Sequence, residues 1–548
     1  MQEVTTASSM GDPKAPILII GPSPTRIAMK ARKPILGPRS DLLNTCMKYA
    51  KIHKHEVYYL NLFPFYVKED RRGVLYDEFN EVLWRPKKGF TERGLAETEG
   101  QMELVRRSDA NVICSLGPMV LDRFTGEQAH TKWRGSVLNW TQEQEGFNII
   151  RRKLVPLLDP DFIIKGNRLY QDVMVHDLAV ARKESSSPDL APPDYKMIID
   201  PSFNDCIDYM REASKGDRVA TDIECLNHQV SCFCITPTPD ESMCIPLIGR
   251  DGGHRWTEAQ ELSIWDAYSK IMGNPDIQKI NQNMFFDMSF LLTQNGIITR
   301  GDIGDPMVGH HMLYPDFPKG LDFLVSMHTN IPYYKDDGKI WKKPWADSDT
   351  FWKYNARDGI AAIRVWDAIQ DDLDDGYRHT YDGTIEVMYS LLYMYARGAA
   401  IDQEKLKEAK AKAEKMLERL YGDLHEITGP NFNPLSPKQC QEYFYGTLGI
   451  KPYTNRSTGR PTTDDKAMAR LFSTHGIKEA RIVQEIRGIE KLKGTYLDIQ
   501  FDRDGRLRCS WNPRGTTTGR LSSGKTIQGT GMNMQNLPPA FKGFIVGG

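Results

Sequence analysis

Two acidic residues in the segment RVATDIECL have the types and the spacing of metal ligands. Asp222 and Glu224 are two residues apart on a predicted strand, so both carboxylates project from the same face of it. Two negative charges this close resist joint ionisation unless a cation lies between them. The pair therefore predicts a divalent-cation site and metal-assisted chemistry.

Two further segments each place an acidic residue one helical turn after a polar one. KINQNMFFDMSFLL carries Asn283 and Asp287, and FWKYNARDGIAAI carries Tyr354 and Asp358. Residues four apart share one face of a helix. Incidental surface carboxylates are the alternative interpretation, but a charge among so many apolar residues is costly without a partner. Their order within one predicted domain favours a single site.

Taken in order, the three segments resemble the motifs of the DnaQ-like, DEDDy-type 3′→5′ exonucleases, over about residues 196 to 375. The resemblance implies an RNase H-like fold, in which a mixed sheet carries the acids at one end and helices surround it. It also implies two bound cations about 4 Å apart, one activating water and one stabilising the leaving 3′-oxygen. Ligation by oxygen alone suits Mg²⁺ or Mn²⁺.

The same resemblance assigns a role to each residue. Asp222 would bridge both ions, Glu224 and Asp358 would hold the ion that carries the nucleophile, and Asp287 would act on the second ion through water. Tyr354 would orient the attacking water as a hydrogen-bonding group, because a phenol is too weak an acid to be ionised at neutral pH. A contact of Asn283 with the terminal nucleotide is also implied.

The surrounding elements predict an α/β domain that positions these residues. Strands are predicted near 217 to 224, 231 to 237 and 242 to 248, and helices over 256 to 273, 283 to 294 and 351 to 372. Cys232 and Cys234 share one face of a predicted strand and are interpreted as small core side chains, since no CxxC spacing occurs among the nine cysteines.

The first part of the chain is predicted to be a separate parallel α/β domain. PILIIG, EVYYLNLF and NVICSLG read as buried strands separated by helical patterns. GPSPTRIAMKARKPILGPRSDLL, YYLNLFPF, SLGPMVL and VPLLDPDFI resemble the uracil-DNA glycosylase superfamily, over about residues 14 to 183. The Ser- and Pro-rich stretch after this domain reads as a linker.

This glycosylase-like domain departs from the pattern of active members. Pro22-Ser23-Pro24 stands where an acidic or amide residue is common, and Leu158-Asp159-Pro160 stands at the H-P-S element. A glycosylase needs a water-positioning group and a stabiliser for the departing base, so we expect an inactive, DNA-holding or structural domain. Candidate phosphate contacts, with a solvated basic loop as the alternative, are Lys30, Arg32, Lys33 and Arg39.

From about residue 380 the pattern becomes mostly helical. In IDQEKLKEAKAKAEKMLERLYGDL, Asp402 is a predicted helix N-cap, ahead of apolar residues at helical spacing. The predicted apolar face consists of Leu406, Ala409, Ala413, Met416, Leu420 and Leu424. After residue 500 the sequence is rich in Gly, Thr and Ser and strand-like.

This C-terminal region resembles the family A DNA polymerases. RGTTTGRLSS and NMQNLPP are similar to their primer-template-binding segment, and KLKGTY, NPLSPKQ and STGRPTTDD are similar to their thumb. An arginine among small residues can approach a duplex closely, and amides suit minor-groove acceptors. The implied DNA-binding residues are Lys491, Lys493, Arg520, Gln535 and Asn536.

The sequence ends in FKGFIVGG, where the polymerases continue with the palm aspartates and the fingers helix. Without the palm carboxylates there is no nucleotidyl transfer, so we expect no DNA synthesis by this chain alone. A polymerase encoded in two pieces and a chain cut at this point both remain open. Because an unpaired apolar strand invites association, Phe544-Ile545-Val546 predicts a second polypeptide carrying palm and fingers.

Composition sets wider bounds. The 548 residues should form about three or four domains. With 71 basic and 72 acidic residues, net charge argues neither for nor against nucleic acid. The N-terminus lacks the features of a signal peptide and no long apolar stretch occurs. We therefore expect a cytoplasmic protein, in the host cytoplasm if it is from a bacteriophage, with no membrane association.

Together these observations predict an α/β multidomain protein. Its expected parts are a glycosylase-like domain (1–185), a linker (186–196), an exonuclease domain (197–378), a helical thumb (379–500) and an incomplete palm (501–548). The expected function is proofreading by a metal-dependent 3′→5′ exonuclease within a bacteriophage-type family A polymerase, acting on single-stranded 3′ ends and primer-template duplex. A stand-alone exonuclease and a non-catalytic DNA-binding scaffold are the alternatives.

Overall fold

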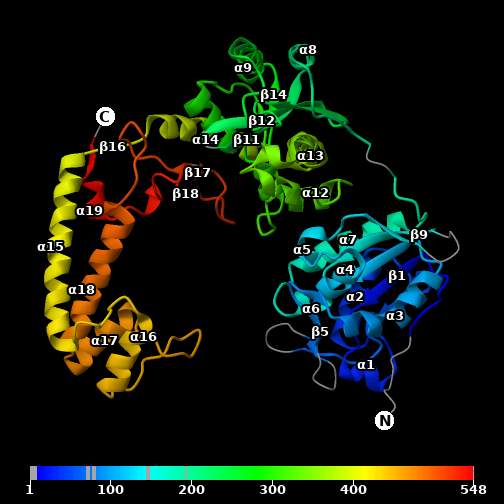
Figure 1. Cartoon of the computed structure of the whole chain (residues 1–548), viewed down its shortest axis with the longest axis horizontal. Helices are drawn as coiled ribbons and strands as arrows, with labels where there is room; N and C mark the ends of the chain where they lie inside the picture. The colour runs from blue at the N-terminus through cyan, green and yellow to red at the C-terminus, as the bar shows by residue number, and fades with distance from the viewer. Residues whose placement is uncertain are drawn as a thin grey trace. The chain divides into compact units, whose positions relative to one another are not determined.

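A computed structural model of the chain describes residues 9–69, 75–76, 82–143, 149–191, 194–226, 228–526 and 528–546. The chain divides into two compact units, Met1–Glu386 and Val387–Gly548. The predicted α/β multidomain class is confirmed (Figure 1). Two residues of the predicted linker, Pro192 and Pro193, and the last two glycines, Gly547 and Gly548, lie outside the described residues.

The first sheet of the N-terminal unit has five strands in the order β2-β1-β7-β9-β8. Its strands are β1 (Ile17–Gly21), β2 (Val57–Asn61), β7 (Val112–Leu116), β8 (Leu138–Glu143) and β9 (Ile149–Leu157). Neighbouring strands are parallel except β8, which runs antiparallel to β9 at the edge. The inner strands are continuous apolar runs because helices cover both faces of a parallel sheet.

A second, antiparallel sheet in the same part of the chain was not predicted. It consists of β3 (Lys68–Glu69), β4 (Leu75–Tyr76), β5 (Val82–Arg85) and β6 (Gly89–Phe90). The helices around the two sheets are α1 (Arg26–Lys30), α2 (Pro38–Tyr49), α3 (Glu92–Arg107), α4 (Gly117–Thr125), α5 (His130–Trp133), α6 (Pro160–Ile164) and α7 (Tyr170–Glu184). Strands this short have weak periodicity, which explains why the sequence pattern missed them.

The third sheet is mixed, as predicted, with the order β10-β13-β12-β11-β14-β15. Its strands are β10 (Lys196–Ile198), β11 (Arg218–Leu226), β12 (Gln229–Thr238), β13 (Glu241–Pro246), β14 (Gln278–Ile280) and β15 (Ile303–Gly304). The helices are α8 (Phe203–Ala213), α9 (Glu258–Gly273), α10 (Met284–Phe290), α11 (Pro306–Leu313), α12 (Leu321–His328) and α13 (Ser348–Asp374).

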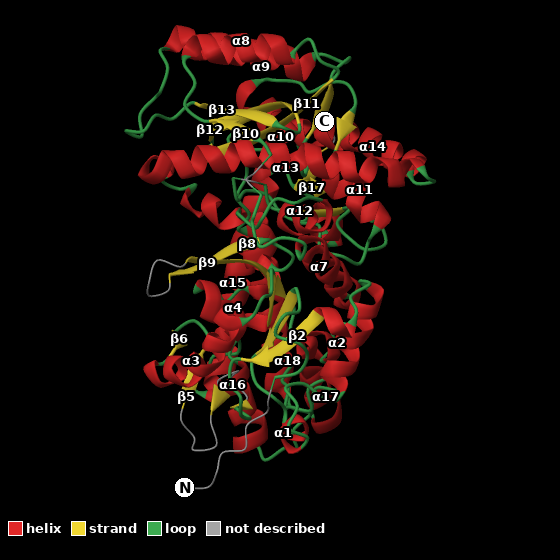
Figure 2. Ribbon diagram, turned by 90° about the vertical axis from the view of Figure 1, so that its right-hand side faces the viewer, coloured by secondary structure: helices red, strands yellow, loops and turns green. Residues whose placement is uncertain are grey.

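Helices pack on both faces of this sheet, with α8 and α9 on one side and α13 on the other (Figure 2). Strand β12 shows the alternation that this arrangement needs. Phe233 packs against Trp265 and Tyr268 of α9, whereas Cys232 and Cys234 point the other way, toward α13. Both cysteines are buried free thiols, as the sequence indicated.

Two long helices build the C-terminal unit, α15 (Gln403–Thr428) and α18 (Lys478–Leu492), and they pack side by side. Helices α16 (Pro437–Gln441) and α17 (Asp465–His475) also belong to this unit, and α14 (Arg378–Arg397) runs through the boundary between the two units. Asp402 caps α15 as predicted, accepting a hydrogen bond from Lys405 N. One predicted core position is wrong: Met416 is 40% exposed, and Leu417 packs in the core instead.

The end of the chain corrects the expectation of an unpaired apolar strand. After β17 (Ser510–Asn512), β18 (Ser522–Gly524) and α19 (Pro539–Lys542), strand β19 (Ile545–Val546) pairs antiparallel with β16 (Ala400–Ile401). Phe544 O also accepts a hydrogen bond from Asp402 N at 2.8 Å. The strand therefore has a partner within this chain, far away in sequence, and does not by itself call for a second polypeptide.

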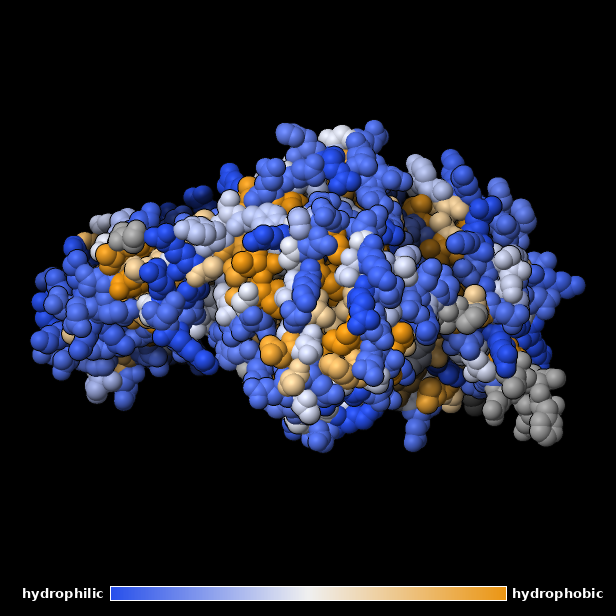
Figure 3. Space-filling model, turned by 90° about the horizontal axis from the view of Figure 1, so that it is seen from above, coloured by the Kyte–Doolittle hydropathy of each residue, from blue (hydrophilic) through white to orange (hydrophobic). Residues whose placement is uncertain are grey.

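Hydrophilic residues dominate the face seen in Figure 3, with apolar residues gathered in patches between them. Exposed apolar side chains include Leu262 and Tyr393, which is ordinary for a globular surface. Within the described residues, no helix is both long and apolar enough to span a membrane.

Candidate active site

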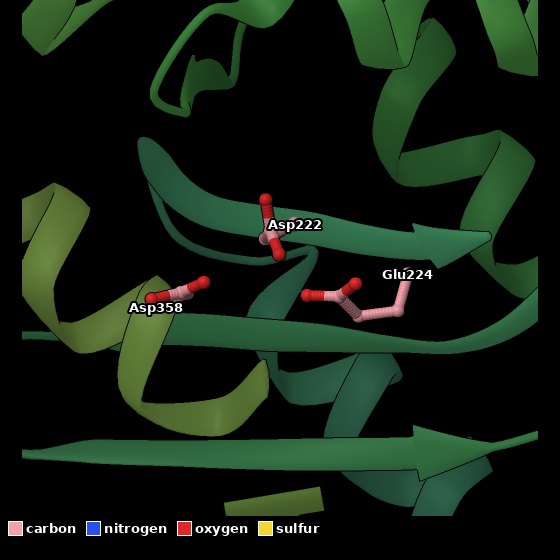
Figure 4. Close-up of side chains that lie close together, drawn as sticks. All are labelled: Asp222, Glu224 and Asp358. Carbon is pink, nitrogen blue, oxygen red and sulfur yellow. The ribbon is translucent and has the colours of Figure 1, made fainter. Parts of the chain in front are cut away.

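Three of the four predicted carboxylates converge in a cleft of about 170 Å³ in the N-terminal unit. Asp222 and Glu224 project from β11, Asp358 projects from α13, and one oxygen of each lies within 4.8 Å of the others. The three side chains point toward one another (Figure 4). Because Asp222 and Glu224 alternate with the buried Thr221 and Ile223, the period of the strand itself places both acids on one face.

Helix α13 reaches the sheet closely enough to deliver its acid because of a glycine. A Cβ at Gly359 would lie 2.8 Å from Cys234 Sγ on β12. The helix is also tied to β11 by Asn355, whose Nδ2 donates to Asp222 O at 3.1 Å and to Asp222 Oδ2 at 3.3 Å. Gly359 therefore permits the close approach of α13, and Asn355 holds Asp358 near β11, the strand that carries the other two acids.

Asp287 lies in the same cleft but outside the group of three. Its Oδ1 accepts a hydrogen bond from Ile223 N at 3.1 Å, so it contacts β11 between the two strand acids. Asn283 precedes its helix as the N-cap, in a left-handed conformation with φ of 62°. Both residues line the cleft.

The carboxylate of Asp305, a residue that the sequence interpretation missed, stabilises the left-handed conformation of Asn283. This carboxylate accepts hydrogen bonds from Asn283 N (3.1 Å) and Met284 N (3.0 Å) at the start of α10. It also accepts from Met307 N (2.9 Å) and Val308 N (3.3 Å) at the start of α11. The Asp-Pro pair that opens α11 was a local signal for an N-cap, but the link to the other helix is tertiary.

A second missed group consists of Tyr334 and Lys335, just before α13. Lys335 Nζ donates to Asp358 Oδ1 (2.9 Å), to Asp358 Oδ2 (2.7 Å) and to Tyr354 OH (2.7 Å). Tyr334 OH donates to Asp358 Oδ1 at 2.5 Å. The predicted site residues Tyr354 and Asp358 are therefore joined through a lysine that no sequence motif indicated.

The clustering of acids shifts their pKa values upward. Burial and the neighbouring Asp358 raise the pKa of Asp222 to about 7. Burial and Asp222 raise the pKa of Glu224 and of Asp287 well above their ordinary values. Burial likewise raises the pKa of Tyr354, with the acids adding to the effect, so its phenol stays neutral. Such a site gains from a bound cation, which stabilises the charged carboxylates.

At Lys335, in contrast, the charged form is the favoured one. Burial works against its charge, but contact with Asp358 outweighs burial, and the pKa of Lys335 is raised. The ammonium is therefore charged at neutral pH. Among the described residues that line the cleft, it is the one basic side chain.

The predicted DNA-binding residues of the C-terminal unit fall into two groups. Gln535 is joined to the Arg520 segment: its Nε2 donates to Leu521 O at 2.9 Å, and its Oε1 accepts from Ser523 Oγ at 3.2 Å. Arg520, Gln535 and Asn536 are exposed. On α18 and the turn that follows it, Lys491 is exposed, but Lys493 pairs with Glu414 at 3.3 Å.

The glycosylase-like region contains a cleft of about 950 Å³. Arg39, a predicted phosphate contact, is instead paired there with Asp161. Asp159 caps α6, accepting from Asp161 N at 2.8 Å, and burial raises its pKa. His130, which no motif indicated, also lines this cleft, and burial lowers its pKa to about 4.

Comparisons with known proteins match three families to successive parts of the chain, in the order that the sequence predicted. Residues 8–178 match the uracil DNA glycosylase superfamily, residues 206–374 match a 3′-5′ exonuclease family, and residues 403–543 match DNA polymerase family A.

Similar curated proteins are DNA polymerases. DNA polymerase I of Rhizobium leguminosarum is 27% identical over 324 residues, covering 55% of this chain and 31% of the relative. DNA polymerase I of Pseudomonas aeruginosa is 25% identical over 378 residues (65% and 40%), and the DNA polymerase of Escherichia phage T5 is 29% identical over 306 residues (49% and 35%). The chain thus spans 31% to 40% of the lengths of these relatives.

A solved structure shares the fold. The POL domain of Pol1 from M. smegmatis, in complex with DNA primer-template and dNTP, aligns with a TM-score of 0.50 at 19% identity, covering 64% of this chain and 59% of that one. The order of the three regions comes from the family matches, whose residue ranges follow one another along the chain. The chain therefore contains, in this order, regions similar to the uracil DNA glycosylase superfamily, to a 3′-5′ exonuclease family and to DNA polymerase family A.

Proposed function

We propose that the protein is a metal-dependent 3′→5′ DNA exonuclease that proofreads for a family A DNA polymerase. The observation that carries the proposal is the approach of Asp222, Glu224 and Asp358 to within 4.8 Å of one another in a cleft that Asp287 and Tyr354 also line. A scaffold protein has no need to place acids at this cost in electrostatic repulsion.

The residues present fit a pair of Mg²⁺ or Mn²⁺ ions. The donor set is oxygen alone, and the raised pKa values of Asp222 and Glu224 indicate that the positive charge of Lys335 does not offset burial and the repulsion among the acids. Asp222, Glu224 and Asp358 would hold the ions directly. Asp287 would act on the second ion through water. Bound ions would polarise the scissile phosphodiester and activate the attacking water.

The chain's own residues position the substrate and the water. Tyr354, kept neutral by burial, can accept and donate hydrogen bonds and so orient a water molecule without acting as its base. Asn283 lies at the edge of the same cleft with a side chain suited to the terminal nucleotide. The small volume of the cleft, about 170 Å³, supports a single-stranded 3′ end as the proposed substrate.

For the remaining chain we propose the division expected from the sequence: 1–185, 186–196, 197–378, 379–500 and 501–548. Arg520, Gln535, Asn536, Lys491 and Lys493 would grip primer-template duplex. DNA synthesis would require the palm carboxylates and the fingers helix of a family A polymerase, on the same chain or on a second polypeptide. Similarity to the phage T5 polymerase supports a bacteriophage-type enzyme.

We propose that the glycosylase-like domain is inactive and holds DNA. Asp159, in the Leu158-Asp159-Pro160 segment that stands at the H-P-S element, is engaged as a helix cap, and Arg39 is engaged by Asp161. Lys30, Arg32 and Lys33 remain proposed phosphate contacts, as the sequence suggested. Release of uracil from duplex DNA by the full chain, lost on Asp159→Asn, would contradict this part of the proposal.

The first test is digestion of a 3′-labelled single-stranded oligonucleotide by the full chain with Mg²⁺. Asp222→Ala should lower the rate by about 10³-fold or more, because it removes the ligand shared by the site. Asp266→Ala, an exposed acid on α9 paired with Lys270, should leave the rate unchanged. Equal digestion by Asp222→Ala and wild type would refute the exonuclease assignment and favour a scaffold.

A further inference from the structure

The exonuclease cleft contains a fixed positive charge from the chain itself. Lys335 begins a short 3-10 helix, Lys335–Ile340, between α12 and α13. Its Nζ lies 2.7 to 2.9 Å from both oxygens of Asp358 and 2.7 Å from Tyr354 OH. The three nearest polar atoms to this ammonium thus belong to two residues of the candidate catalytic group.

The segment that carries Lys335 is built against these partners. A Cβ at Gly338 would lie 2.6 Å from Tyr354 Cζ, so the chain passes directly over the tyrosine ring. Asp337 pairs with Arg357 of α13 at 3.2 Å. The segment that carries Lys335 therefore packs against α13 at two further points, beside the contacts of the ammonium itself.

We propose that Lys335 is the counter-ion of the cation-free exonuclease site and that it must release Asp358 when a divalent cation binds. Asp358 offers both of its oxygens to Lys335, and Tyr334 OH takes a further position on Oδ1. A unit positive charge a few ångström from a divalent cation repels it. Lys335 thereby stabilises Asp358 by direct contact, and Asp222 and Glu224 by its charge, before a cation arrives, and it weakens the binding of that cation. This inference rests on the proposed exonuclease function.

The test is a direct titration of the full chain with Mn²⁺, in which calorimetry records the heat of binding. Lys335→Met keeps the length of the side chain and removes its charge, and should tighten Mn²⁺ binding about tenfold or more. In EDTA the same variant should melt at a lower temperature than wild type, and saturating Mn²⁺ should raise its melting temperature by more than that of wild type. Lys335→Gln provides a second uncharged variant if the first does not fold.

The matched control is Lys339→Met. Lys339 lies one turn along the same segment, pairs with Asp336 at 3.0 Å and is mostly exposed, so its loss should leave Mn²⁺ affinity unchanged. Equal or weaker Mn²⁺ binding by both Lys335 variants would overturn the proposal, because it would make the lysine a simple structural contact. If wild type neither binds Mn²⁺ nor digests DNA, the exonuclease proposal itself fails. If wild type does both and the Lys335 variants match it, only the role of Lys335 fails.

Discussion

At the residue scale, the phenol of Tyr354 is the group whose contribution can be isolated most cleanly. Its ring packs over Gly338 and beside Phe351, and its hydroxyl contacts Lys335. Tyr354→Phe removes only the oxygen and preserves the packing. We expect the turnover rate of exonuclease digestion to fall about 10²-fold with KM little changed, because the proposed role of the lost hydroxyl is to orient the attacking water.

Single-turnover digestion of a labelled oligonucleotide measures this change. Tyr377→Phe, at an exposed position beyond the end of α13, is the matched control and should behave as wild type. A change confined to KM would show that Tyr354 contacts the substrate and does not orient water.

At the scale of elements, one buried carboxylate joins two helix starts. Asp305 accepts four backbone hydrogen bonds from the beginnings of α10 and α11. Asp305→Ala leaves these N–H groups without their acceptor and should lower the free energy of unfolding by about 2 to 4 kcal/mol. Digestion should also slow, because α10 carries Asp287 and follows Asn283.

Chemical unfolding and the digestion assay, run together on the full chain, check both effects. Asp402→Ala is the matched control, since Asp402 caps only α15 in the C-terminal unit. It should cost about 1 kcal/mol and leave digestion unchanged. Full activity of a folded Asp305→Ala variant would mean that the start of α10 does not depend on this carboxylate.

At the scale of the whole molecule, buried histidines couple stability to pH. Burial and the neighbouring His328 and His311 lower the pKa of His310 from 6.5 to about 4. Between these values the unfolded chain binds more protons than the folded chain, so stability falls as the pH drops from about 6.5 toward about 4. Above about pH 6.5 this residue should not contribute to the change of stability with pH.

His310→Phe keeps an aromatic ring at this position and removes the imidazole that binds the proton. Relative to wild type, the variant should lose less stability between about pH 7.5 and about pH 5.5, by up to about 1.4 kcal/mol per pH unit for one proton. Urea unfolding at the two pH values measures the difference. The exposed His379→Phe should keep the wild-type dependence, and an unchanged slope in His310→Phe would show that other groups dominate.

Much of the site was predictable from the sequence because its signals are local. The two-residue spacing of Asp222 and Glu224 and the four-residue spacing of Tyr354 and Asp358 follow from the periods of a strand and a helix. The same holds for the cap at Asp402. Such patterns lie in neighbouring residues and can be recognised before any coordinates. The mixed sheet and the convergence of the acids at one end of it were implied by the resemblance to the DnaQ-like exonucleases and not by these spacings.

The tertiary structure alone decided the contacts between distant segments. Lys335 on Asp358, Asp305 on the start of α10, Arg39 on Asp161 and β19 on β16 each join residues whose own neighbourhoods carry no sign of the partner. A lysine or an aspartate in a loop has the same local pattern whether it is solvated or buried against charge. Only the packing of the chain determines which, because burial is what makes a charged group require a partner.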